Sequence, residues 1–233
     1  MHAHVDSIFD PVRNHAITKP IRPCDAVGIT PIVFVIDDDV SVRESLELLI
    51  RATGRQTQTF ASAEQFLAHP RGLVPCCAIV DLMLPKISGL ELQKELSDVH
   101  EIPLIFVSGH ADIAMTVQAM KAGAVEFLTK PLRADLLVKA IDDAIERSRG
   151  ALRLHSEMRA LTGSYESLTL RERQVISLVA AGLLNKQVGF ELGISEHTVK
   201  AHRGQVMRKM NADSLADLVM MSIRLGLLPT VKH

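Results

Sequence analysis

Between residues 31 and 146, short apolar runs alternate with segments whose apolar residues recur at helical spacing. Such runs predict strands, and the segments between them predict amphipathic helices. Strands separated by helices form parallel sheets with helices on both faces. The predicted strands are Pro31–Ile36, Gln56–Phe60, Cys76–Val80, Ile102–Val107 and Val125–Thr129.

These five strand–helix units predict a doubly wound α/β domain with a flavodoxin-like sheet over residues 31–146. Gln56–Phe60 is mostly polar, as expected of a strand at the edge of a sheet. Residues 1–30 show no clear period, and we expect them to form a mobile N-terminal extension of unassigned role.

The pattern changes after residue 146. Residues 147–164 are basic and compatible with a helix. They have few large apolar residues at coiled-coil spacing, so a helical linker is favoured over a coiled coil. Residues 165–233 predict a small all-α domain in which four short helices form a helix-turn-helix fold. Its expected stops and caps are Gly182, Asn185, Ser195 and either Asp213 or Ser214.

Composition is that of an ordinary globular protein, with 47% hydrophobic and 23% charged residues in a chain of 233. No apolar run approaches the roughly 18 residues of a membrane span, and the N-terminus lacks the pattern of a secretory signal. The three cysteines are too few for a disulfide framework, and Cys76 and Cys77 are expected to be core thiols. We therefore expect a cytoplasmic protein without a membrane partner.

The net charge of −1 conceals two halves of opposite charge. Residues 31–146 carry ten basic and seventeen acidic residues, whereas residues 147–233 carry thirteen basic and seven acidic residues. A basic second half suggests a nucleic-acid partner. With no Trp and one Tyr, the chain lacks the aromatic residues on which single-stranded bases stack, which favours double-stranded DNA.

Chemically active residues follow four of the predicted strands. Asp37 and Asp38 follow the first, and Asp81, Ser108 and Lys130 follow three others. Because the carboxyl ends of parallel strands meet at one edge of a sheet, these side chains should converge. The combination suits an aspartate that accepts a phosphoryl group beside a divalent cation.

These motifs resemble the receiver domain of two-component response regulators, in the FixJ branch of the NarL/FixJ family. The matching motifs are Asp37-Asp38-Asp39, Asp81 with Pro85 and Gly89, Ser108-Gly109-His110 and Lys130-Pro131. The resemblance implies that a sensor histidine kinase phosphorylates Asp81. It also implies Mg²⁺ as the cofactor, bound by Asp37, Asp38, Asp81 and the backbone carbonyl of Met83.

The same resemblance assigns three further roles. Lys130 would pair with a phosphoryl oxygen. Ser108 would be the switch hydroxyl that bonds the new phosphate, and Phe127 the switch aromatic that turns inward as the hydroxyl moves. A phosphoryl group adds roughly −1.5 to −2 charges, enough to bias a bistable surface.

A haloacid-dehalogenase-like phosphatase is the alternative, because Asp37-Asp38-Asp39-Val40-Ser41 loosely fits the start of that motif. Asp37 would then be the nucleophile, with Asp142-Asp143 as the acidic pair. That pair lies inside a predicted helix, and Asp81 would have no role. We therefore expect a phosphoacceptor regulator rather than a turnover enzyme.

The C-terminal sequence resembles the LuxR-type DNA-binding domain through Leu168–Val175, Gly182–Lys186 and Gly193–His202. The resemblance makes residues 185–192 the scaffold helix and 196–210 the recognition helix. Helical spacing puts Val199, Val206 and Met210 on the core side. The opposite face presents His197, Lys200, Ala201, Gly204 and Arg208.

This face would enter a major groove, where Lys200 can donate to guanine and Ala201 can touch a thymine methyl group. Relatives often have a longer polar side chain at the position of Gly204, so one base contact is missing or is replaced by close backbone approach. The phosphate-contact candidates are Asn185, Lys186, Thr198, His202 and Arg203.

Together these features predict a response-regulator transcription factor. Phosphorylation would make the receiver dimerise, or would release the DNA-binding domain, so that two recognition helices meet two half-sites. RNA polymerase is the expected further partner. A DNA-binding protein that works independently of phosphorylation is a third possibility, which the intact acidic residues disfavour.

Overall fold

The structure is a computed structural model that describes residues 30–97, 102–109 and 112–227. It divides into two compact units, Met1–Arg153 and Leu154–His233. All of the predicted N-terminal extension except residue 30 lies outside the described residues, as does His110 of the Ser-Gly-His motif.

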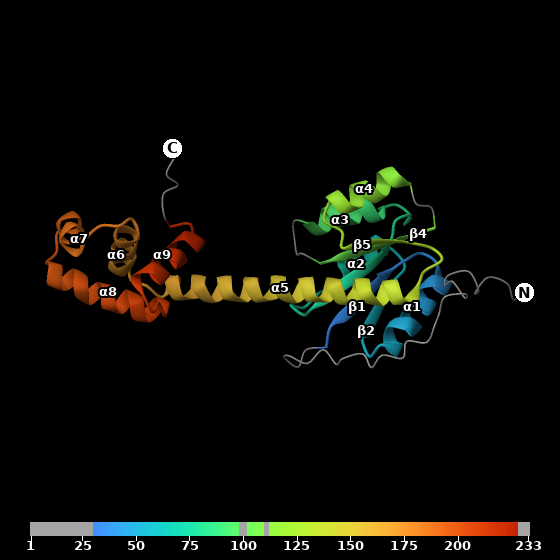
Figure 1. Cartoon of the computed structure of the whole chain (residues 1–233), viewed down its shortest axis with the longest axis horizontal. Helices are drawn as coiled ribbons and strands as arrows, with labels where there is room; N and C mark the ends of the chain where they lie inside the picture. Colours follow the sequence, from blue (N-terminus) through green and yellow to red (C-terminus); the bar gives the residue numbers. More distant parts are fainter. Residues whose placement is uncertain (1–29, 98–101, 110–111, 228–233) are drawn as a thin grey trace, which may run out of the picture. The chain divides into compact units, whose positions relative to one another are not determined.

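The first unit contains one five-stranded parallel sheet (Figure 1). The order of its strands is β2-β1-β3-β4-β5, which is the flavodoxin-like order. The predicted fold class of this unit is therefore confirmed. The strands are β1 (Ile32–Ile36), β2 (Gln56–Phe60), β3 (Cys76–Asp81), β4 (Leu104–Ser108) and β5 (Glu126–Thr129).

Helices cover both faces of this sheet and enclose two separate cores. Two helices, α1 (Val40–Ala52) and α5 (Ala134–Glu166), pack on one face. Three shorter helices, α2 (Ala63–Ala68), α3 (Gly89–Ser97) and α4 (Ile113–Lys121), pack on the other. Buried apolar side chains of the strands alternate between the two cores, as the two-residue period of a strand requires.

The polar strand β2 lies at an edge of the sheet, as predicted. Just before it, Arg55 is buried and pairs with Asp142 of α5. Cys77 of β3 is fully buried in the core between the sheet and helices α1 and α5, and burial raises the pKa of its thiol far above the ordinary value. It is therefore a core thiol, as expected.

Over its described residues the second unit is all-α, and the four short helices found there confirm the predicted fold class of the C-terminal part. They are α6 (Leu170–Ala180), α7 (Asn185–Leu192), α8 (Glu196–Met210) and α9 (Leu215–Arg224). Leu161 and Tyr165, near the end of α5, pack into the same core. Helix α5 also runs without interruption through Gly150 and the predicted linker.

Local sequence fixes the ends of these helices. Thr169 caps α6 in a capping box with Glu172, and Glu172 in turn pairs with Lys209 of α8 at 2.7 Å. Ser195 and Ser214 cap α8 and α9 as predicted. The prediction that Asn185 caps α7 was wrong. Leu184 holds that position, and its N–H donates to the side chain of Gln187.

Gly89 allows α3 to lie directly against the end of β3. A Cβ atom at this position would lie 2.8 Å from the carbonyl oxygen of Asp81 and 3.0 Å from the ring of Phe106. Both neighbours are fixed, one by the sheet and the other by the core. No side chain larger than hydrogen fits here without moving the strand that ends in Asp81.

We predict that Gly89→Ala lowers the free energy of unfolding by about 1–3 kcal/mol, the usual result of overpacking a tight core. Gly150→Ala is the matched control, because a Cβ there meets no atom within 4 Å. It should leave stability unchanged or raise it by up to about 1 kcal/mol, as in other helix interiors. Chemical denaturation of the three proteins measures both values. Equal stability of the two variants would contradict the packing argument.

Candidate functional site

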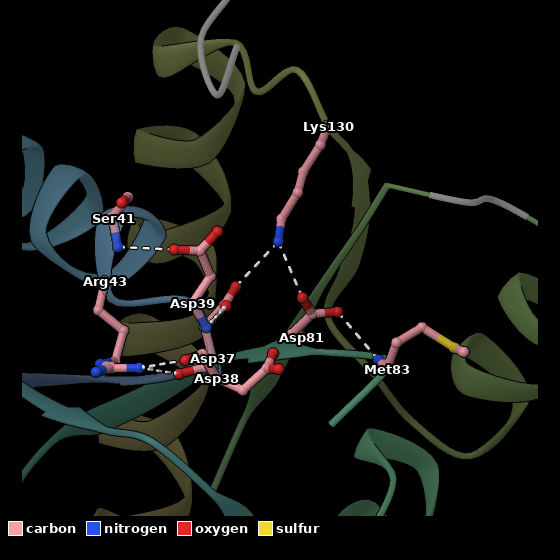
Figure 2. A network of polar contacts seen from close by, with 8 residues as sticks. All are labelled: Asp37, Asp38, Asp39, Ser41, Arg43, Asp81, Met83 and Lys130. Carbon is pink, nitrogen blue, oxygen red and sulfur yellow. Dashed lines mark hydrogen bonds and ion pairs between the residues drawn. The ribbon is translucent and has the colours of Figure 1, made fainter. Parts of the chain in front are cut away.

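Three of the predicted residues meet at the carboxyl edge of the sheet. Asp37 follows β1, Asp81 ends β3, and Lys130 follows β5. The Lys130 Nζ atom donates to Asp37 Oδ2 at 3.0 Å and to Asp81 Oδ2 at 2.9 Å (Figure 2). The pocket therefore consists of carboxylates from two neighbouring strands, which one ammonium group bridges.

Asp38 completes a set of oxygen donors. One carboxylate oxygen each from Asp37, Asp38 and Asp81 lie within 4.8 Å of one another. Hard oxygen ligands at this spacing suit Mg²⁺ or a similar divalent cation. Lys130 neutralises only part of the negative charge of three carboxylates, so the donor set fits a cation in both geometry and charge.

The pocket is electrostatically strained. Burial raises the pKa of Asp37 to about 6, although Lys130 and the Asp39 amide partly counter this effect. Burial alone would lower the pKa of Lys130, but its bonds to Asp81 and Asp37 outweigh this effect and leave the pKa above its usual value. Lys130 is therefore a fixed cation in this pocket, whereas Asp37 is a carboxylate that burial disfavours.

The loop between β1 and α1 holds the acidic residues in a tight turn. The Asp39 amide donates to Asp37 Oδ1 at 2.9 Å, and Asp39 Oδ1 caps α1 by accepting from the Ser41 amide at 2.8 Å. Asp39 is therefore a helix cap and no member of the clustered oxygen donors. Arg43 also binds this loop, although the sequence analysis did not single it out.

Both oxygens of the Asp81 carboxylate are engaged. Lys130 binds Oδ2, and the Met83 amide donates to Oδ1 at 3.0 Å. The Met83 side chain is exposed, and its backbone carbonyl remains a predicted metal ligand. The carboxylate is thus fixed in one orientation before any ligand binds.

The two predicted switch residues lie on adjacent strands. Ser108 ends β4 and is fully buried, and its carbonyl accepts from the Lys130 amide at 2.8 Å. Phe127 lies on β5 beside Phe106 and is partly buried against the core under α2, α3 and α4. Their switching roles remain predictions.

The acidic pair of the phosphatase alternative lies elsewhere. Asp142 and Asp143 are inside α5, where Asp142 pairs with Arg55. Neither belongs to the cluster of Asp37, Asp38 and Asp81. The two residues that the phosphatase alternative assigned as its acidic pair are therefore not part of the pocket around Asp37.

Helix α8 has one face in the core and an opposite face that is exposed. Val199, Val206 and Met210 are buried, as their spacing predicted. The opposite face is exposed, and it consists of His197, Lys200, Ala201, Gly204 and Arg208. Gln205 and Glu196 also lie exposed on this helix and pair with Arg208 and Lys200 respectively. Neither partner is predicted from the sequence.

The predicted phosphate contacts occupy different environments. Arg203 donates to Asn185 Oδ1 at 2.6 Å and thereby ties α8 to the start of α7. Thr198 and His202 are half-buried, and Thr198 bonds the capping Ser195. Lys186 is exposed. Asn185 and Arg203 are therefore hydrogen-bonded to each other before any DNA binds. The sequence predicted them as two separate phosphate contacts.

None of the helices that the structure describes has both the length and the apolar character needed to cross a membrane.

Two protein families match the chain. Residues 33–142 match the response regulator receiver domain, and residues 166–222 match the luxR family of bacterial regulatory proteins. Each match falls within one of the two structural units.

Relatives with both parts are similar along most of the chain. Nodulation protein W of Bradyrhizobium diazoefficiens is 48% identical over 84% of this chain and 87% of its own length. The transcriptional regulatory protein FixJ of Rhizobium meliloti is 39% identical over 85% and 98%. The solved structure of the response regulator StyR, 44% identical, covers 84% of this chain and 99% of its own with a TM-score of 0.74.

Proposed function

Since this chain belongs to the NarL/FixJ family of two-component response regulators, we propose that Asp81 accepts a phosphoryl group from a sensor histidine kinase. The chain is a transcription factor in which a receiver domain precedes a LuxR-type DNA-binding domain. The observation that carries the proposal is the Asp81 carboxylate, which Lys130 and the Met83 amide orient beside two further carboxylates.

In the proposed reaction an Asp81 oxygen bonds to phosphorus while the bond from phosphorus to the histidine nitrogen of the kinase breaks. The product is an acyl phosphate. Lys130 is already in place to pair with the transferred oxygens, so little reorganisation is needed as charge moves. Mg²⁺ held by Asp37, Asp38, Asp81 and the Met83 carbonyl would neutralise the phosphoryl oxygens.

The response to phosphorylation would begin on the two strands that follow β3 in the sheet. Ser108 lies one strand from Asp81 and would bond the new phosphate, and Phe127 on the next strand would turn with it. We propose that this change promotes dimerisation, or frees the DNA-binding domain, and that the DNA-bound protein acts on RNA polymerase.

Because promoter DNA is the target, we assign the protein to the cytoplasm. Hydrolysis of the acyl phosphate would restore the resting state without making the protein a turnover enzyme.

We predict that Asp81→Asn abolishes phosphorylation by acetyl phosphate and loses most activation of a target promoter, because the amide cannot act as the nucleophile. Asp112→Asn makes the same chemical change at the cap of α4, where Asn caps as well as Asp. It should be phosphorylated like the wild type. Mass spectrometry of the intact protein measures the phosphoryl group. Phosphorylation of the Asp81 variant on Asp37 would support the phosphatase alternative instead.

We predict that Lys200→Ala weakens binding to the operator by about tenfold, within the range of about 1–3 kcal/mol for one base contact. Binding to unrelated DNA should change much less, so the ratio of the two affinities should fall. Lys139→Ala removes the same charge from an exposed position of the receiver domain and serves as the control. Fluorescence anisotropy at one fixed salt concentration measures all of these affinities. An equal loss on both DNAs would assign Lys200 to the phosphates.

We predict that phosphorylation shifts the full-length protein from monomer to dimer. Sedimentation velocity with and without beryllofluoride, a phosphoryl analogue, measures the change. The Asp81→Asn variant should remain monomeric in both conditions. A wild-type protein that is monomeric with and without the analogue would remove dimerisation from the mechanism and leave release of the DNA-binding domain.

A further inference from the structure

Arg43 binds the backbone of the acidic loop rather than any of its carboxylates. Its Nη1 atom donates to the carbonyl oxygen of Asp37 at 2.7 Å and to that of Asp38 at 3.0 Å. Figure 2 shows the guanidinium on one side of the loop, with Lys130 and Asp81 on the other. We propose that Arg43 is a positioning residue that aims the Asp38 carboxylate at the cation. This inference rests on the proposed Mg²⁺ site.

Asp38 depends most on this support. Asp37 is buried and bonded by Lys130 and the Asp39 amide, so its carboxylate is fixed independently. The Asp38 side chain is exposed, and within the part of the chain that the structure describes it has no hydrogen-bond or ion-pair partner. Its direction is therefore set by its own backbone, and Arg43 holds the carbonyl of that backbone.

Helix α1 makes Arg43 a rigid support. The Arg43 amide donates to the Asp39 carbonyl at 3.1 Å in the first turn of the helix, and the next residue before it, Val42, is anchored in the core. The guanidinium thus reaches back over the loop from a fixed backbone. Residues that orient metal ligands from outside the ligand set commonly affect metal affinity strongly.

The charge of Arg43 and its hydrogen bonds have opposite effects on the affinity for Mg²⁺. A guanidinium near a cation site repels the cation, so loss of the charge alone would tighten Mg²⁺ binding. Loss of the hydrogen bonds frees the two peptide groups and lets the Asp38 carboxylate leave the site, which weakens binding. The direction of the change in affinity therefore distinguishes positioning from a simple charge effect.

The test is Mg²⁺ titration of the full-length protein by calorimetry, without a phosphoryl donor. Arg43→Ala should bind Mg²⁺ about tenfold more weakly, the lower end of the usual effect of removing such a support. Arg51→Ala removes the same charge from the same helix and should bind like the wild type, because the Arg51 side chain pairs with Glu47 and, among the described residues, with no group of the acidic loop. Arg43→Lys should fall between wild type and the alanine variant, because one ammonium nitrogen can donate to both carbonyls, as Nη1 does, but is a strongly hydrated charge on a flexible stem.

Kinetics provide a second measurement. With acetyl phosphate, Arg43→Ala should raise the Mg²⁺ concentration for half-maximal phosphorylation by about tenfold, with the rate at saturating Mg²⁺ close to wild type. The shorter Arg43→Gln side chain cannot span both carbonyls, so this variant should show the same increase as Arg43→Ala. It keeps the test possible if the alanine variant fails to fold. An affinity equal to or tighter than wild type in these variants would overturn the proposal. So would a lower melting temperature with unchanged Mg²⁺ affinity.

Asp38→Asn separates this proposal from the one on which it rests. If that variant binds Mg²⁺ as tightly as the wild type, the assignment of the metal site itself fails. If Asp38→Asn loses Mg²⁺ binding while Arg43→Ala retains it, the metal site stands and only the role of Arg43 is wrong.

Discussion

The bridge that Lys130 forms between Asp37 and Asp81 is the interaction on which the receiver pocket depends. Buried carboxylates repel one another and lose hydration, so a cluster of them is stable only with compensating charge. One ammonium beside three ionised carboxylates leaves a net charge of −2, which equals in magnitude the charge of one Mg²⁺ ion. The folded chain therefore holds a site with excess negative charge, and a divalent cation would balance that charge.

Strand order determines which residues can share this site. The strands that carry Asp37 and Asp81 are neighbours, and β4 separates Asp81 from the strand that precedes Lys130. Lys130 must therefore reach across the end of β4, where Ser108 lies and where the Ser108 carbonyl accepts from the Lys130 amide. Ser108 therefore lies between the strand that ends in Asp81 and the strand that precedes Lys130. The close approach of α3 at Gly89 packs that helix directly against the end of β3.

Sequence alone predicts the strands, the helices and the members of the pocket. Each of these depends on a local signal: the two-residue period of a strand, the period of a helix, or a polar residue at the end of a strand. Arg43 could not be predicted in the same way, since its role depends on a side chain that reaches back to carbonyls five and six residues away. The Arg203–Asn185 bond likewise joins two helices through rotamers that no period reveals. Asn185 was predicted as a cap from its residue type, but Gln187 satisfies the Leu184 amide from inside the helix.

The exposed face of α8 explains why control by dimerisation would be effective. Lys200 pairs with Glu196, and Arg208 pairs with Gln205, so both cations already have partners before DNA arrives. These pairs must open or rearrange for the cations to contact DNA, and Gly204 adds no side chain to the face. A single domain gains affinity mainly from phosphate contacts, so one copy with few unengaged cations binds weakly. Two linked copies convert the second binding event into an intramolecular one and raise the combined affinity without any new contact. A receiver that dimerises on phosphorylation would therefore control occupancy of the operator, even if it left the recognition helix itself unchanged.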